Sequence, residues 1–215
     1  MVTPYIFHQT PIIAEYHTEV LAPEIRKSII APIAAPDPIP DVPFYSQFKD
    51  IASPSWQKIG CGVASLAMVI NYFEPDTVSV NTLLNRGIAA GAYIKNAGWI
   101  HKGLIDLSKK YDLDGKAYDL SKTDSKTALA AFSKQLKDGP LIASVHYKFE
   151  PTNPIPHLVV INAIEDGLVY YNDPAAKTGG KTISITAFLK SWKQKFIAIR
   201  PIKTTAEKNA LIAKL

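Results

Sequence analysis

The sequence is short of the residues on which several classes of site depend. Its 215 residues include a single cysteine, Cys61. One cysteine cannot form an internal disulfide, and it cannot supply the several thiolates of a cysteine-rich zinc site. Chains without disulfides occur both inside and outside the cell, so this count leaves the compartment open.

Long apolar runs and basic clusters are missing as well. No stretch approaches the roughly 18 apolar residues of a membrane helix, and the N-terminus does not resemble a signal peptide. We expect no stable membrane insertion, and a cytoplasmic protein if this N-terminus is native or a secreted one if a signal peptide was removed. The net charge is +5, but the lysines are scattered, which argues against nucleic-acid binding.

The rest of the composition is that of a soluble globular domain, with 47% hydrophobic and 20% charged residues. Half of the 16 prolines fall at or before position 43. Proline fixes φ and biases the preceding residue toward extended backbone. The sequence therefore predicts a proline-rich extended arm over residues 1–40, a folded domain over 41–202 and a polar tail over 203–215.

Periodicity within the domain predicts helices first and strands afterwards. Helical spacing and cap signals predict helices over 61–73, 80–90, 99–111 and 125–137. Short β-branched or aromatic runs predict strands over 141–147, 157–164, 168–172, 181–185 and 196–200, with a short helix over 186–193 capped by Thr186. This order indicates an α+β fold in which N-terminal helices pack on a mostly antiparallel sheet.

Cys61 lies between two glycines at the start of an apolar helix. A helix N-terminus carries partial positive charge and free N–H groups, which favour the reactive thiolate over the thiol. The flanking glycines would keep the backbone low enough for a substrate carbonyl to approach. A lone cysteine is also compatible with a small buried core residue.

A cysteine nucleophile needs a base within hydrogen-bond reach, and five histidines are available. His157 opens an apolar strand after a proline-rich loop, which would fix the ring and leave one edge open. His146 lies inside a predicted strand and is the second candidate. His101 is expected on the helix surface, and His8 and His17 belong to the arm.

The histidine also needs an orienting group, and a predicted hairpin can deliver Asp173. If residues 165–167 form a three-residue loop between the strands, Asp173 falls opposite Val159, on the same face as His157. A two-residue loop would put the two side chains on opposite faces. The alternative for Asp173 is a plain turn that ends a strand. Gln47 could donate its amide N–H₂ to an oxyanion, although a loop glutamine alone indicates little.

These motifs, in this order, resemble the bacteriocin-processing cysteine peptidases of family thirty-nine and their stand-alone relatives. The resemblance rests on VPFYSQ, GCGVASLAMVINYF, HLVVINAI and YYNDPAAKTGG, and it covers roughly residues 41–201. It implies a papain-like fold, with Cys61 as nucleophile, His157 as base, Asp173 as orienter and Gln47 as oxyanion donor. It implies a peptide or protein substrate and no metal or organic cofactor.

Two other functions stay open on the same scaffold. An amine could resolve the thioester in place of water, which would make the protein a transferase. Alternatively, the cleft could hold a peptide or leader segment without cutting it. The substrate, the oligomeric state and the role of the arm are not encoded in any motif we find.

Overall fold

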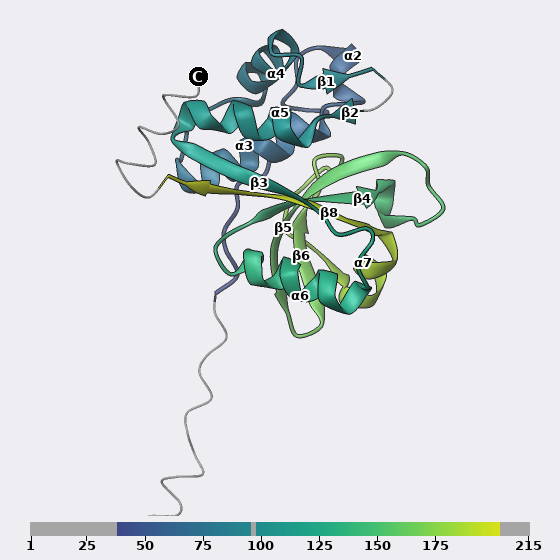
Figure 1. The fold of residues 1–215 in the computed structure, drawn as a ribbon. Coiled ribbons are helices and arrows are strands. Elements are labelled where there is room, and N and C mark those ends of the chain that lie inside the picture. Colours follow the sequence, from purple (N-terminus) through teal and green to yellow (C-terminus); the bar gives the residue numbers. More distant parts are fainter. Residues whose placement is uncertain (1–37, 96–97, 203–215) are drawn as a thin grey trace, which may run out of the picture. The chain divides into compact units, whose positions relative to one another are not determined.

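The computed structural model describes residues 38–95 and 98–202, which form the folded domain (Figure 1). Nearly all of the predicted arm, and the whole of the predicted tail, lie outside the described residues, so both stay predictions. Within the described part of the chain, no helix combines the length and the apolar character that crossing a membrane requires.

Six α-helices are present in the described residues. Three of them match the predicted helices over 61–73, 80–90 and 125–137 to within a residue or so. The predicted helix over 99–111 begins later, because Trp99 ends a strand instead. The helices are α2 (Pro54–Gln57), α3 (Cys61–Phe73), α4 (Val80–Ala89), α5 (His101–Ser108), α6 (Ser125–Leu136) and α7 (Ile185–Ser191), with 3-10 turns η1 (Lys109–Tyr111) and η2 (Tyr147–Phe149).

Side-chain caps explain where several helices begin. The Ser79 hydroxyl accepts a hydrogen bond from the Thr82 N–H at α4, and the Asp124 carboxylate accepts one from the Thr127 N–H at α6. The predicted cap of α7 was wrong, because Ser184 and not Thr186 accepts the N–H of Ala187. The helix therefore starts one residue earlier than expected.

The main sheet is antiparallel throughout, in the order β3-β8-β4-β5-β6-β7. Strand β3 was not expected, because it is a mostly polar edge strand in which only Leu113 is buried. A separate two-stranded hairpin precedes α5. The strands are β1 (Tyr93–Ile94), β2 (Gly98–Trp99), β3 (Leu113–Asp119), β4 (Leu141–His146), β5 (Pro156–Glu165), β6 (Leu168–Asn172), β7 (Lys181–Ser184) and β8 (Trp192–Pro201).

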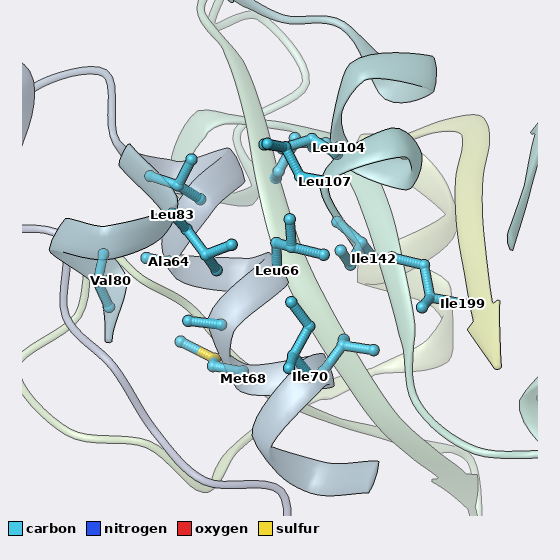
Figure 2. Close-up of a cluster of buried hydrophobic side chains, with 14 of the residues drawn as sticks. Ala64, Leu66, Met68, Ile70, Val80, Leu83, Leu104, Leu107, Ile142 and Ile199 are labelled. Carbon is cyan, nitrogen blue, oxygen red and sulfur yellow. The ribbon is translucent and has the colours of Figure 1, made fainter. Parts of the chain in front are cut away.

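Helices cover both faces of this sheet, so the domain has two apolar cores. Helices α3, α4 and α5 lie on one side, and α6 and α7 lie on the other (Figure 1). Figure 2 shows the first core, where Leu66 and Ile70 of α3 face Ile142 and Ile199 of the sheet. Ten of the 13 residues of α3 are buried. This central helix therefore holds Cys61, its first residue, in a fixed position.

The hairpin between β5 and β6 reaches the predicted register by a route that the sequence did not reveal. Its loop has two residues, Asp166 and Gly167, both at positive φ, and Glu165 pairs with Leu168. That loop alone would put His157 and Asp173 on opposite faces. However, the register shifts between Ile161 and Ala163, so that Asn162 is an extra residue in β5.

This β-bulge restores the parity that the three-residue loop was expected to provide. Beyond the bulge Ile161 pairs with Tyr171 and Val160 pairs with Asn172. Continuing the ladder brings Asp173 opposite Val159, on the face that His157 shares. The predicted loop length was wrong, and the predicted outcome follows from the bulge instead.

Candidate active site

Cys61 is the first residue of α3 and is partly exposed. The first bond of this helix runs from the Ala64 N–H to the Gly60 carbonyl at 3.1 Å, so the Cys61 N–H precedes the helical ladder. Close packing also explains the flanking glycines. A Cβ at Gly60 would lie 2.1 Å from Ile51, and one at Gly62 would lie 2.5 Å from Trp99. The two glycines therefore leave room for the side chains of Ile51 and Trp99, in addition to keeping the backbone low beside Cys61.

His157 near the start of β5 is 4% exposed, and its Nε2 lies 2.6 Å from Oδ1 of Asp173. The ring of Tyr147 stands perpendicular to the imidazole, with 5.2 Å between the ring centres. Burial lowers the pKa of His157, but hydrogen bonds to Asp173 and Cys61, together with their charges, outweigh it and raise the pKa to about 9. The protonated imidazole is therefore the favoured form between these two partners.

Asp173 is held by the turn that follows β6. Its Oδ1 accepts a second hydrogen bond from the Ala175 N–H at 2.8 Å, and its carbonyl accepts the Ala176 N–H at 2.9 Å. Two donors on one carboxylate oxygen fix the rotamer of the side chain. The turn that ends β6 and the contact between Asp173 and His157 therefore occur together. A turn at Asp173 does not exclude this contact with the histidine.

Gln47 is 3% exposed and is tied to the same turn, because its N–H donates to the Pro174 carbonyl at 2.9 Å. Its Nε2 donates to the Gln57 carbonyl at 2.7 Å, which leaves the second amide proton of Nε2 for another acceptor. Its Oε1 is buried without a hydrogen-bond partner among the described residues. Gln57, just before Cys61, thus fixes the orientation of this amide.

One cleft of about 500 Å³ brings these groups together. Cys61, His157 and Gln47 all line it, and Asp173 stands behind the histidine. Its described walls contain no aspartate or glutamate, and the described residues hold no cluster of His, Cys, Asp and Glu that could bind a metal ion. The other lining residues are Phe48, Lys58, Ile59, Tyr93, Gly98, Trp99, His101, Ser144, Tyr147, Ile155, Pro156 and Leu158.

Two other histidines have been placed by the structure. His146 is half-buried, and its Nδ1 lies 2.7 Å from the Asn153 carbonyl, as befits a satisfied strand residue. The surface position expected for His101 was wrong, since its side chain is partly buried, lines the cleft and lies 3.1 Å from Ser144 Oγ. Its helix, α5, begins two residues after Trp99, which packs on Gly62. His8 and His17 lie outside the described residues.

The chain matches the model of the Peptidase_C39 like family over residues 39–196. The chain belongs to this family. This membership supports a cysteine-peptidase-type function. The family match begins near the predicted start of the folded domain.

Similar proteins agree with this assignment. The uncharacterized protein YvpB of Bacillus subtilis is 29% identical over 169 residues, which span 63% of this chain and 65% of YvpB. A C39-like peptidase candidate from Bacillus anthracis has a TM-score of 0.56 at 20% identity, covering 77% of this chain and 98% of that structure.

A double glycine motif protease from an AMS/PCAT transporter, solved with a leader peptide, has a TM-score of 0.54. The two chains are 22% identical, and the match covers 78% of this chain and 97% of the solved one. At these identities the two solved structures show the shared fold alone. The α+β, papain-like architecture predicted from the sequence is confirmed.

Sequence reasoning missed Asn172, which joins the segments that carry Gln47 and Asp173. Its Nδ2 donates to the Val42 carbonyl at 2.9 Å, and its Oδ1 accepts the Gly180 N–H at 2.8 Å. The side chain is 2% exposed. An asparagine that ends a buried strand just before Asp-Pro was the available signal, because a buried amide there must find backbone partners.

We expect Asn172→Ala to destabilise the domain by about 1–3 kcal/mol, because it leaves the buried Val42 carbonyl without its hydrogen-bond donor and removes the bond to the Gly180 N–H. Chemical denaturation measures this change. Asn153→Ala is the matched control, since Asn153 makes an exposed side-chain contact to Ile155 N–H. Equal stability of the two variants would contradict the bridging role of Asn172.

Proposed function

We propose that this protein hydrolyses peptide bonds through Cys61, His157 and Asp173, with a thioester intermediate. One observation carries the proposal. The sole cysteine stands at a helix N-terminus in a cleft that it shares with His157, whose other edge is bonded to Asp173 at 2.6 Å. This is the arrangement of nucleophile, base and orienting acid that covalent acyl transfer requires.

The reaction begins with the proton of the Cys61 thiol. Asp173 engages Nε2 of His157, so Nδ1 is the ring nitrogen left to take that proton. The thiolate then attacks the peptide carbonyl carbon, and the carbonyl electrons move onto oxygen. As the tetrahedral intermediate collapses, the C–N bond breaks and His157 returns the proton to the leaving amine. Water, deprotonated by His157, attacks the thioester and releases the acid and the thiol.

The developing oxyanion needs hydrogen-bond donors that are already in place. The Cys61 N–H lies ahead of the α3 ladder, and Gln47 offers its second amide proton from a side chain held by the Gln57 carbonyl. Both donors are neutral, so they do not disturb the thiolate–imidazolium pair. We assign the oxyanion hole to these two groups.

The substrate class follows from the cleft and from a relative. The double glycine motif protease with the same fold was solved with a leader peptide. In this chain the cleft is walled by apolar side chains, of which Phe48 and Ile155 are 43% and 55% exposed. An extended peptide would cover these side chains on binding. A binding module without catalysis is less favoured, because it has no use for a buried imidazole paired with Asp173.

The proposal is tested with internally quenched peptide mixtures, combined with alkylation of Cys61. Iodoacetamide reports only this thiol, because the chain has no other cysteine. We expect peptide cleavage, and loss of cleavage in step with alkylation. Product analysis with an added primary amine at low concentration separates hydrolase from transferase, because a hydrolase still releases mainly the acid whereas a transferase releases the amide in its place. Cleavage that survives complete alkylation would refute the proposal.

We expect Gln47→Ala to lower kcat by about 10²–10³-fold with little change in KM, because an oxyanion donor acts mainly in the transition state. Steady-state kinetics and the rate of Cys61 alkylation are measured together. Alkylation has no oxyanion and should stay close to the wild-type rate. Gln135→Ala, on α6 away from the cleft lining, is the control. An unchanged kcat would remove Gln47 from the assignment.

A further inference from the structure

The cleft contains a second histidine that the proposed reaction does not use. His101 is the first residue of α5, and its Nε2 lies 3.1 Å from Oγ of Ser144. Both side chains line the cleft together with Cys61 and His157. The pair therefore joins the helical layer to the sheet within the substrate-binding space.

Ser144 is an exception in its own strand. The other residues from Leu141 to Val145 are apolar and buried, and Ser144 itself is 8% exposed. It pairs with Leu158, directly beside His157 in β5. The β4–β8 ladder also shifts register between Ser144 and Val145. Such irregularities commonly redirect side chains beside functional sites.

The surroundings of His101 leave its imidazole neutral. Burial lowers the pKa of His101, Lys195 lowers it further, and Asp119 acts in the opposite direction. Lys195 and Asp119 form an ion pair at 2.9 Å, so their effects on His101 partly cancel. The two histidines of the cleft are thus held in different protonation states. His157 carries the proton for chemistry, and His101 stays uncharged.

The pair retains unused hydrogen-bonding capacity that faces the cleft. A neutral imidazole has one donor and one acceptor, and a hydroxyl has one donor and two acceptor positions. The bond between Nε2 and Oγ uses only part of this capacity. Nδ1 of His101 has no hydrogen-bond partner among the described residues. A ligand can therefore find both a donor and an acceptor here.

We propose that His101 and Ser144 form a specificity subsite that selects a substrate residue with a hydroxyl or carboxamide side chain close to the scissile bond. The inference rests on the proposed function, because it requires a peptide in the cleft. Serine, threonine, asparagine and glutamine side chains can both donate and accept, which matches the pair.

Other side chains fit this pair less well. An apolar side chain would remove water from the imidazole and the hydroxyl without replacing its hydrogen bonds, so the unused donor and acceptor positions of both groups would be left unpaired. A carboxylate would lose its hydration against an uncharged imidazole, and the lining's one lysine, Lys58, is itself exposed. A lysine ammonium would likewise lose its hydration against two uncharged groups.

The test compares peptides that differ only near the cleaved bond, carrying Asn or Ser, Ala, Leu, or Asp at each flanking position in turn. For the wild-type protein we expect kcat/KM to be about tenfold higher with Asn or Ser at one position than with Ala or Leu. Ser144→Ala and His101→Phe should reduce this preference to about twofold. His146→Phe is the control and should leave the preference unchanged.

A second arm keeps this inference separate from the proposed function. Calorimetry with Cys61→Ala measures binding of the same peptides without cleavage, so the subsite is tested even if no peptide is cut. The preference for Asn or Ser must appear there and disappear when Ser144→Ala is added. Preference for Leu or Asp, or a preference that survives Ser144→Ala, overturns the subsite. If the wild-type protein cleaves no peptide but the binding preference is present, only the proposed peptidase function is overturned.

Discussion

Replacing Cys61 with alanine is expected to lower kcat/KM on a cleaved peptide by about 10⁴-fold or more, because the covalent route disappears. The fold should survive, since Cys61 is partly exposed at the start of α3 and alanine is a strong helix former. Steady-state kinetics and thermal unfolding on the same samples measure the two effects.

Cys61→Ser makes this experiment sharper. Serine supplies a hydroxyl of similar size in place of the thiol, but a hydroxyl is far less acidic. This variant should therefore be almost as inactive as Cys61→Ala. Ser125→Ala is the matched control, because Ser125 is a small residue at the first position of another helix, α6. It should cleave at the wild-type rate. Retained hydrolysis in either Cys61 variant would defeat the assignment of the nucleophile.

The second large effect is expected for Asp173→Ala, in both rate and pH dependence. In the wild-type protein the pKa of His157 is raised to about 9, so its proton is present below that pH and is lost above it. The leaving amine needs this proton, so kcat/KM should fall on the alkaline side with an apparent pKa about 9. Burial, which lowers this pKa, remains in the variant, while the hydrogen bond that raises it is lost.

Asp173→Ala should therefore move the alkaline limb toward lower pH and reduce kcat/KM by about 10²–10⁴-fold. Full pH–rate profiles of both proteins measure the shift. Asp106→Ala is the control, because Asp106 is a half-exposed carboxylate of α5 whose ion pairs among the described residues are with Lys102 and Lys109. An alkaline limb that stays in place in Asp173→Ala would mean that Asp173 does not act through His157.

The two histidines of the cleft show why the sequence pattern singled out His157 and misplaced His101. His157 opens an apolar strand after prolines, so its local sequence already limits where the ring can point. His101 follows a helical pattern whose start was placed at Trp99, two residues early. The β2 strand includes Trp99, which packs on Gly62, so α5 begins only at His101. A contact between residues as distant in the sequence as Gly62 and Trp99 cannot be predicted from the helical spacing of apolar residues.

The hairpin that carries Asp173 makes the same point about register. The sequence indicated both strands and put Asp173 on the same face as His157, but it could not reveal the bulge at Asn162. A bulge depends on how β5 pairs with its two neighbours at once, and its energy is a sum over both ladders. Strand β3 was missed for a related reason, because its pairing with β8 compensates for a polar sequence of weak strand propensity.

By itself, the sequence determined the properties that depend on neighbours along the chain. These are the apolar helix that begins at Cys61, the strand order that favours an antiparallel sheet, and the residue types able to act as nucleophile, base and acid. Only the tertiary structure decided that Gln47, Cys61, His157 and His101 line one cleft, with Asp173 bonded to the far edge of His157. The reason is physical: local preferences fix backbone conformation one segment at a time, whereas distances between segments follow from packing two cores around one sheet.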